Sequence, residues 1–71
     1  MAKIFYITYE NGKHQLYEQE VNSKNRADVY DQLENKETVV GAWDREKYAK
    51  AWLRYYNQEI TVDELNRVLS S

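Results

Sequence analysis

The pattern of apolar and polar residues near the start of the chain is typical of a β-hairpin. Segment 3–9 (KIFYITY) is rich in β-branched and aromatic residues, segment 14–21 (HQLYEQEV) alternates, and Asn11 and Gly12 stand between them. An Asn-Gly pair favours the two-residue type I′ turn, because both of its central positions need a positive φ. Two strands joined by this turn are therefore predicted.

The same turn fixes which residues face each other across the hairpin. Tyr6 is expected opposite Tyr17, and Tyr9 opposite His14. One face then carries the better set of core side chains, namely Phe5, Ile7, Tyr9, His14 and Leu16. The other face is mixed, and the Tyr6/Tyr17 pair is flanked there by Ile4, Thr8, Gln15, Gln19 and Val21. We expect the first face to be the core.

Signals for one helix and one further strand follow the hairpin. Ser23 or Asn25 can cap a short helix that Asn35 can end. Segment 37–43 (ETVVGAW) has the β-branched residues of a strand and an interior glycine. A helix and then a third strand are therefore predicted.

Two more helices are predicted in the rest of the chain. Asp44 is expected to cap a helix over 45–57, whose apolar positions span an arc of roughly 200° and so need more than one contact. Thr61 and Glu64 form a capping box, which predicts a last helix beginning at this point.

These elements define a single small α+β domain over 1–71, in the order β-β-α-β-α-α. A right-handed crossover through the first helix places the third strand beside the first and parallel to the second, which gives the spatial order 2-1-3. Segment 3–9 then lies in the centre of the sheet, as its apolar residues on both faces suggest. The helices are expected mainly on one face.

Composition narrows the chemistry. The chain has no cysteine and one histidine, which excludes disulfides and cysteine-based metal sites, and no cofactor or metal is expected. A formal net charge of -2 argues against both a polybasic tail and an acidic DNA mimic. The chain has neither an apolar run of roughly 18 residues nor a signal-peptide pattern at its start, so a cytoplasmic protein without membrane contact is expected.

Catalysis is not expected. His14 stands beside the turn and opposite Tyr9, where a plain cross-strand contact explains it better than a nucleophilic triad. The paired carboxylates of the chain have basic neighbours and are better read as solvated surface charge than as an acid-base dyad. The sequence therefore predicts that the protein is not an enzyme.

Nucleic-acid binding is the alternative function. Lys47, Lys50 and Arg54 fall within roughly 60° of one another on the predicted helix 45–57, and together with the hairpin they could contact phosphates. The same stripe is also the ordinary polar face of an amphipathic helix. Because charge is spread evenly along the chain, this alternative ranks second.

Aromatic residues are the strongest compositional bias, with seven tyrosines, two tryptophans and one phenylalanine. Two surface patches are predicted: the outer sheet face with Ile4, Tyr6, Tyr17 and Val21, and the edge of the helix 45–57 with Ala51, Tyr55 and Tyr56. The competing interpretations are that a helix covers the outer face or that two copies form a homodimer there.

The function predicted from these patches is that of a small non-enzymatic interaction module. We expect it to bind a larger intracellular protein and to modulate or inhibit it, because exposed Tyr and Trp side chains are typical of protein interfaces. Phage and mobile-element proteins that block host machinery are often of this size and charge, which is an analogy only.

Overall fold

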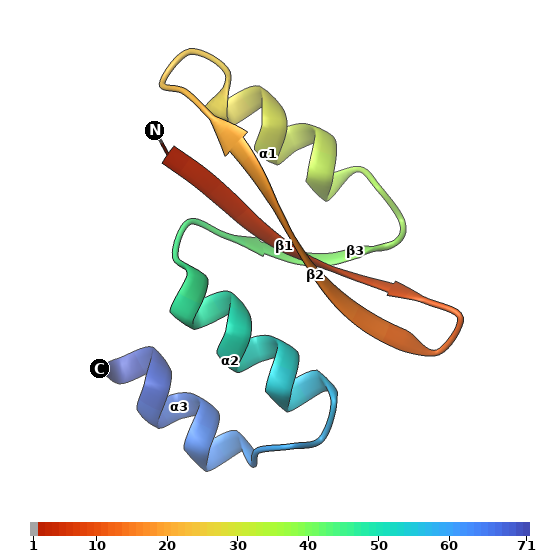
Figure 1. Ribbon diagram of the computed structural model, residues 1–71, viewed down its shortest axis with the longest axis vertical. Helices are drawn as coiled ribbons and strands as arrows, with labels where there is room; N and C mark the ends of the chain where they lie inside the picture. Colours follow the sequence, from red (N-terminus) through yellow and green to blue (C-terminus); the bar gives the residue numbers. More distant parts are fainter. Residues whose placement is uncertain (1) are drawn as a thin grey trace.

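The computed structural model describes residues 2–71, and these residues form three strands and three helices in the predicted order. The elements run through the chain as shown in Figure 1: β1 (Ala2–Glu10), β2 (Lys13–Val21), α1 (Arg26–Glu34), β3 (Val39–Trp43), α2 (Glu46–Tyr56) and α3 (Val62–Ser70). The predicted α+β class is confirmed.

The hairpin has the predicted turn and the predicted register. Asn11 and Gly12 have φ values of 54° and 78°, as a type I′ turn requires. Tyr6 faces Tyr17, and Tyr9 faces His14. The sheet has the order β2-β1-β3 with both pairings antiparallel, so the prediction of β1 as the central strand is confirmed.

The pairing of β3 with β1 contains an irregularity that the sequence did not predict. Ile7 faces Gly41, but the next residue, Thr8, faces Val39, so that Val40 is an extra residue in β3. Beyond this bulge, the backbone N–H of Tyr9 donates a hydrogen bond of 2.8 Å to the carbonyl oxygen of Thr38.

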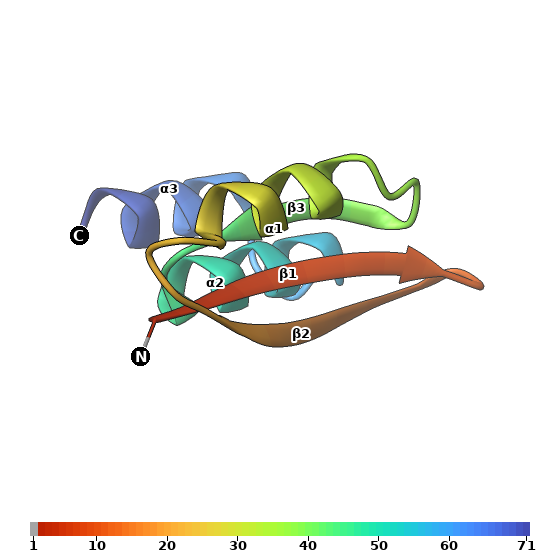
Figure 2. The same cartoon turned by 90° about the horizontal axis from the view of Figure 1, so that it is seen from above.

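The helices lie on both sides of the sheet. Figure 1 shows the sheet from its edge. Helix α1 lies on one face of the sheet and α2 on the other, and α3 packs against the side of α2 that faces away from the sheet. The molecule measures 36 × 32 × 15 Å, and its thinnest dimension is close to the width of three strands about 4.8 Å apart. Figure 2 shows the same flat shape from above.

The face under α1 has its own hydrophobic core, which corrects the prediction of an outer patch. Ile4 and Val21 are 0% and 4% exposed and pack with Val29 and Leu33 of α1. The sequence placed Ile4 and Val21 on an exposed surface, and this part of the prediction is wrong. The crossover helix returns over the face that carries them, so both faces of β1 contribute to a core.

Helix α2 is buried on two opposite sides. Ala49 and Ala51 are both buried. Each residue of a helix is rotated by about 100° from the previous one, so residues two apart lie on nearly opposite sides. One side of α2 contacts the sheet and the other contacts α3, whose Leu65 is buried. The wide apolar arc of α2, which the sequence showed to need more than one contact, is thereby explained.

One of the three predicted N-caps forms its side-chain hydrogen bond, since Asn25 stands at the N-cap position of α1 without a capping hydrogen bond. The Glu64 backbone N–H donates to Thr61 Oγ1 at 3.3 Å, so α3 begins with the predicted cap. Asp44 does not cap α2, which begins after Arg45 without a side-chain cap. The Asp44 carboxylate instead accepts a hydrogen bond of 3.1 Å from Arg26. This ion pair joins the start of α1 to the end of β3.

Candidate protein-binding surfaces

Tyr6 and Tyr17 form a stacked pair on the α1 side of the sheet. Their ring centroids are 5.5 Å apart and their planes differ by 22°, which confirms the predicted cross-strand contact. Tyr6 is half-buried against the α1 core, whereas Tyr17 is 44% exposed on the edge strand β2. Of the four residues predicted on this face, Tyr6 and Tyr17 alone reach the surface.

The region around Tyr17 is polar and uncovered. Helix α1 contacts β3 and covers Val21 at the end of β2, whereas the part of β2 around Tyr17 stays exposed, including Gln15 and Gln19. The Tyr17 hydroxyl donates a hydrogen bond to Gln15 Oε1. A single exposed ring held among amides is a small contact area, so this patch is narrower than the sequence predicted.

A larger aromatic surface lies on the opposite side of the sheet, where the hairpin meets α2. We call it the aromatic row, and it consists of Tyr9, His14, Trp43, Trp52, Tyr55 and Tyr56. His14 lies 4.6 Å from Tyr9 and 4.8 Å from Tyr56, measured between ring centroids. The Trp52 ring continues the row, 5.7 Å from Tyr56 and 6.0 Å from Trp43.

The local sequence explains why these rings come together. On α2, Trp52 and Tyr56 are four residues apart and therefore share one side of the helix. On the hairpin, the register places Tyr9 beside His14 on the face that α2 covers. The row thus joins rings from β1, β2, β3 and α2.

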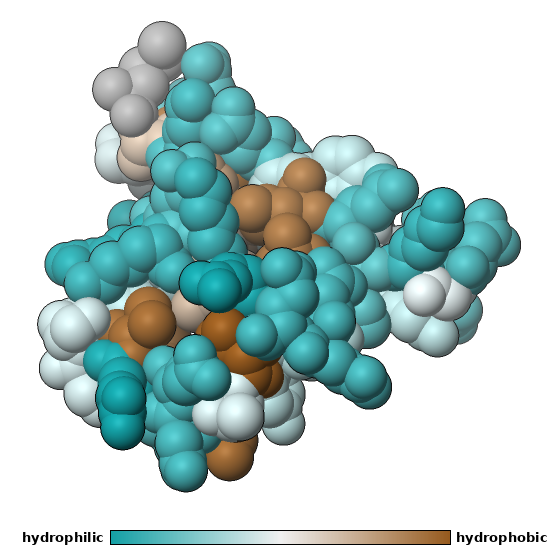
Figure 3. Space-filling model, turned by 60° about the horizontal axis from the view of Figure 1, so that its bottom comes forward, coloured by the Kyte–Doolittle hydropathy of each residue, from teal (hydrophilic) through white to brown (hydrophobic). Residues whose placement is uncertain are grey.

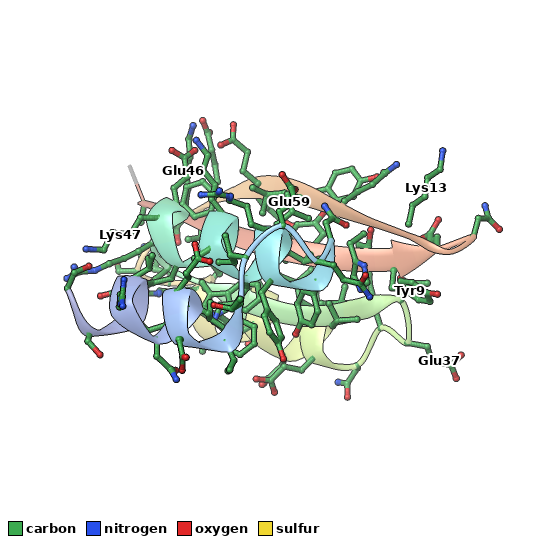
Figure 4. The ribbon with its side chains drawn as sticks, turned by 90° about the horizontal axis from the view of Figure 1, so that it is seen from below. Tyr9, Lys13, Glu37, Glu46, Lys47 and Glu59 are labelled. Carbon is green, nitrogen blue, oxygen red and sulfur yellow. The ribbon has the colours of Figure 1, made fainter. Side chains whose placement is uncertain are left out.

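The rings of the row remain in part accessible. Tyr9 is 49% exposed, and the other members are half-buried. Figure 4 shows Tyr9 near the end of the hairpin. The predicted surface edge of this helix consisted of Ala51, Tyr55 and Tyr56. Both tyrosines are partly exposed, but Ala51 is buried, so this part of the prediction is wrong. His14 and Tyr9 were expected to contact each other, but their connection to Tyr56 was missed.

Tyr56 has the environment of a partly desolvated phenol. Burial raises the pKa of its hydroxyl above the ordinary value, and the neighbouring Tyr55 raises the pKa further.

The basic residues of α2 do not form one continuous stripe. Lys47 turns toward the end of α3, where its Nζ donates to the Ser71 carbonyl oxygen at 3.1 Å, and Figure 4 shows it diverging from Glu46. Lys50 forms an ion pair of 3.4 Å with Glu46 one turn earlier. Arg54 is exposed. The predicted phosphate-binding stripe is thus divided among different neighbours.

The face of the molecule in Figure 3 is mostly hydrophilic. Figure 3 shows hydrophobic areas separated by hydrophilic ones on the face it presents, including the part formed by α2 and α3. Within residues 2–71, no three His, Asp or Glu side chains are grouped so that they could hold a metal ion. None of the helices in this range is long and apolar enough to cross a membrane.

Comparisons with protein-family models, with curated proteins and with solved structures found no significant match to this chain. The aromatic row is therefore interpreted from its own geometry.

Proposed function

We propose that the protein is a small, non-enzymatic binding module that contacts a larger intracellular protein through the aromatic row and modulates or inhibits it. The observation that carries this proposal is the connected set of partly exposed rings between the hairpin and α2. Tyr and Trp are enriched in the energetically dominant centres of protein interfaces, because they bury a large area at low cost in conformational entropy.

The contacts among the rings of the row support a role in binding. Each ring contacts at least one other ring, so the surface is ordered before a partner arrives. A preorganised surface loses less side-chain entropy on association than a set of free side chains. The cytoplasmic location of the partner is part of the proposal, and the absence of cysteine is compatible with a reducing compartment.

Affinity capture with matched variants tests this function. Tyr9→Ser and Tyr55→Ser remove rings from the row, and Tyr17→Ser removes an exposed ring from the opposite face of the sheet. We expect the Tyr9 and Tyr55 variants to lose at least about tenfold in affinity for the captured partner, since interface Tyr residues often contribute more than 1.4 kcal/mol. Circular dichroism must show that all three variants are folded.

Two results of this experiment would contradict the proposal. Folded Tyr9 and Tyr55 variants that retain the partner would show that the row is not the contact surface. Loss of the partner in Tyr17→Ser alone would move the contact to the Tyr6/Tyr17 pair.

Nucleic-acid binding is the second candidate, and the exposed Lys50 and Arg54 are the observation that favours it. It predicts binding of a mixed-sequence DNA duplex that weakens steeply as salt rises, with a smaller slope in Lys50→Ala and Arg54→Ala. The protein-binding proposal predicts no salt-sensitive duplex binding.

A further inference from the structure

Strand β3 is a short edge strand with a bulge, but it lacks charged residues and proline, which are two of the features that protect sheet edges. It pairs with β1 on one side only, and its sequence VVGAW contains no charged residue and no proline. The other edge strand, β2, carries Lys13, Glu18 and Glu20 along its length. Charged side chains on an edge discourage pairing with another chain, so β3 is the edge that is open to a further strand.

A groove runs beside this edge, between β3 and α1. It has a volume of about 320 Å³ and is lined by Tyr30, Glu34, Val39, Val40, Gly41 and Ala42. Val40, the extra residue of the bulge, is 41% exposed here. The groove therefore combines apolar walls with a single acidic side chain.

The two lining residues of α1 have the spacing of alternate residues in a strand. Tyr30 and Glu34 are four residues apart, which corresponds to about 6 Å along a helix. Alternate side chains on one face of a strand are about 6.6–6.8 Å apart. A strand added beside β3 would direct the side chains of one face toward the groove that Tyr30 and Glu34 line.

The negative charge of Glu34 determines which side chain of an added strand would bind beside it. Arg26, at the start of α1, is already paired with Asp44 at 3.1 Å. Glu34 has no ion pair with any residue in 2–71, and it lies in the groove. A lysine or arginine is the side chain that Glu34 would select.

We infer that the free edge of β3 binds an extended segment of a partner protein as an additional strand, with an apolar side chain over Tyr30 and a basic side chain two residues away at Glu34. This mode of binding obtains affinity from main-chain hydrogen bonds and specificity from pockets for alternate side chains. The site lies on the α1 side of the sheet, whereas the aromatic row lies on the α2 side. It is thus independent of the proposed function.

The probe is the synthetic peptide acetyl-Thr-Val-Thr-Lys-Thr-Val-amide, added to the ¹⁵N-labelled full chain at millimolar concentrations. We expect the largest amide shifts within 39–43. Replacing the lysine of the peptide by glutamate should weaken binding about two- to fivefold, the range of an exposed ion pair. Methylating alternate backbone nitrogens of the peptide should weaken it at least about tenfold, because main-chain hydrogen bonds are lost.

Matched variants locate the site. Val40→Lys should abolish peptide binding, whereas Val62→Lys places the same change at a 53% exposed valine of α3 and should leave binding unchanged. Glu34→Gln should remove the preference for the lysine peptide over the glutamate peptide.

Three outcomes would overturn the inference. The first is the absence of shifts within 39–43 at peptide saturation or at the solubility limit. The second is equal binding of the methylated peptide. The third is sedimentation of the free protein as a dimer that Val40→Lys converts to a monomer, which would assign the edge to a second copy of the chain.

Discussion

The imidazole ring of His14 and the phenol ring of Tyr56 lie almost parallel, with their centroids 4.8 Å apart and their planes 8° from each other. Through this contact the end of the hairpin is joined to the last turn of α2, across 42 positions of sequence. The only histidine of the chain therefore takes part in an aromatic contact within the row, which is consistent with the proposed binding function.

The His14/Tyr56 stack should contribute to the free energy of unfolding. In a double-mutant cycle with His14→Ala and Tyr56→Ala, we expect a coupling energy of about 0.5–1.5 kcal/mol, the range for stacked aromatic pairs. Urea denaturation of the four proteins provides the measurement. Additive effects of the two substitutions would show that the rings are adjacent without stabilising each other.

Tyr56 should make stability fall at high pH. Because its pKa in the folded state is raised above the ordinary value near 10, the unfolded chain loses this proton first as pH rises. The contribution of Tyr56 is fully present below pH 10 and is lost as pH rises through the folded-state pKa.

Thermal unfolding between pH 8 and about 11 tests the contribution of Tyr56. We expect Tyr56→Phe to lose less stability over this interval than the wild type. Tyr17→Phe serves as the control at an exposed ring. Parallel pH profiles for the wild type and Tyr56→Phe would contradict the prediction.

Gly41 should be required for the position of Trp43. A methyl group at Gly41 would lie 2.6 Å from the nearest atom of the Trp43 ring, a distance at which the ring must move. We expect Gly41→Ala to destabilise the protein by about 1–3 kcal/mol and to change tryptophan fluorescence, since Trp43 stacks on Trp52. In a Trp43→Leu background the same substitution should cost less, and an equal cost there would refute this explanation.

Tyr6 and Tyr17 should differ in their effect on stability although they stack on each other. Tyr6→Ser removes a half-buried ring beside the α1 core and should cost about 1–3 kcal/mol. Tyr17→Ser removes an exposed ring and should cost about 1 kcal/mol or less. Chemical denaturation distinguishes them, and equal losses would mean that Tyr17 is as structurally important as Tyr6.

Local rules explain why the sheet could be predicted from sequence. The Asn11-Gly12 turn determines the hairpin register. A crossover through the helix after the hairpin can bring the third strand beside the first, which gives the strand order β2-β1-β3. Both rules depend on backbone geometry, so they hold without knowledge of the packing. The bulge at Val40 follows no comparable signal, apart from the neighbouring glycine.

The candidate surfaces were harder to predict because they depend on which helix covers which face. We ranked the faces of the hairpin by their own apolar residues. Such a ranking does not include α1, which packs over Ile4 and Val21. From the sequence of α2 alone, Lys47 belongs to the polar stripe of the helix. In the structure its Nζ donates to the Ser71 carbonyl oxygen at the end of α3. His14 and Tyr56 belong to distant segments, and only the packed structure brings their rings together.

Photo-crosslinking in cells shows whether the aromatic row binds a protein. The photoreactive residue p-benzoylphenylalanine is placed at Tyr9, the most exposed ring of the row, and in a separate variant at Tyr17 on the opposite face of the sheet. We expect a discrete protein crosslink from position 9 and none from position 17. A crosslink from position 17 alone, or no protein crosslink from position 9 in the folded variant, would contradict this expectation.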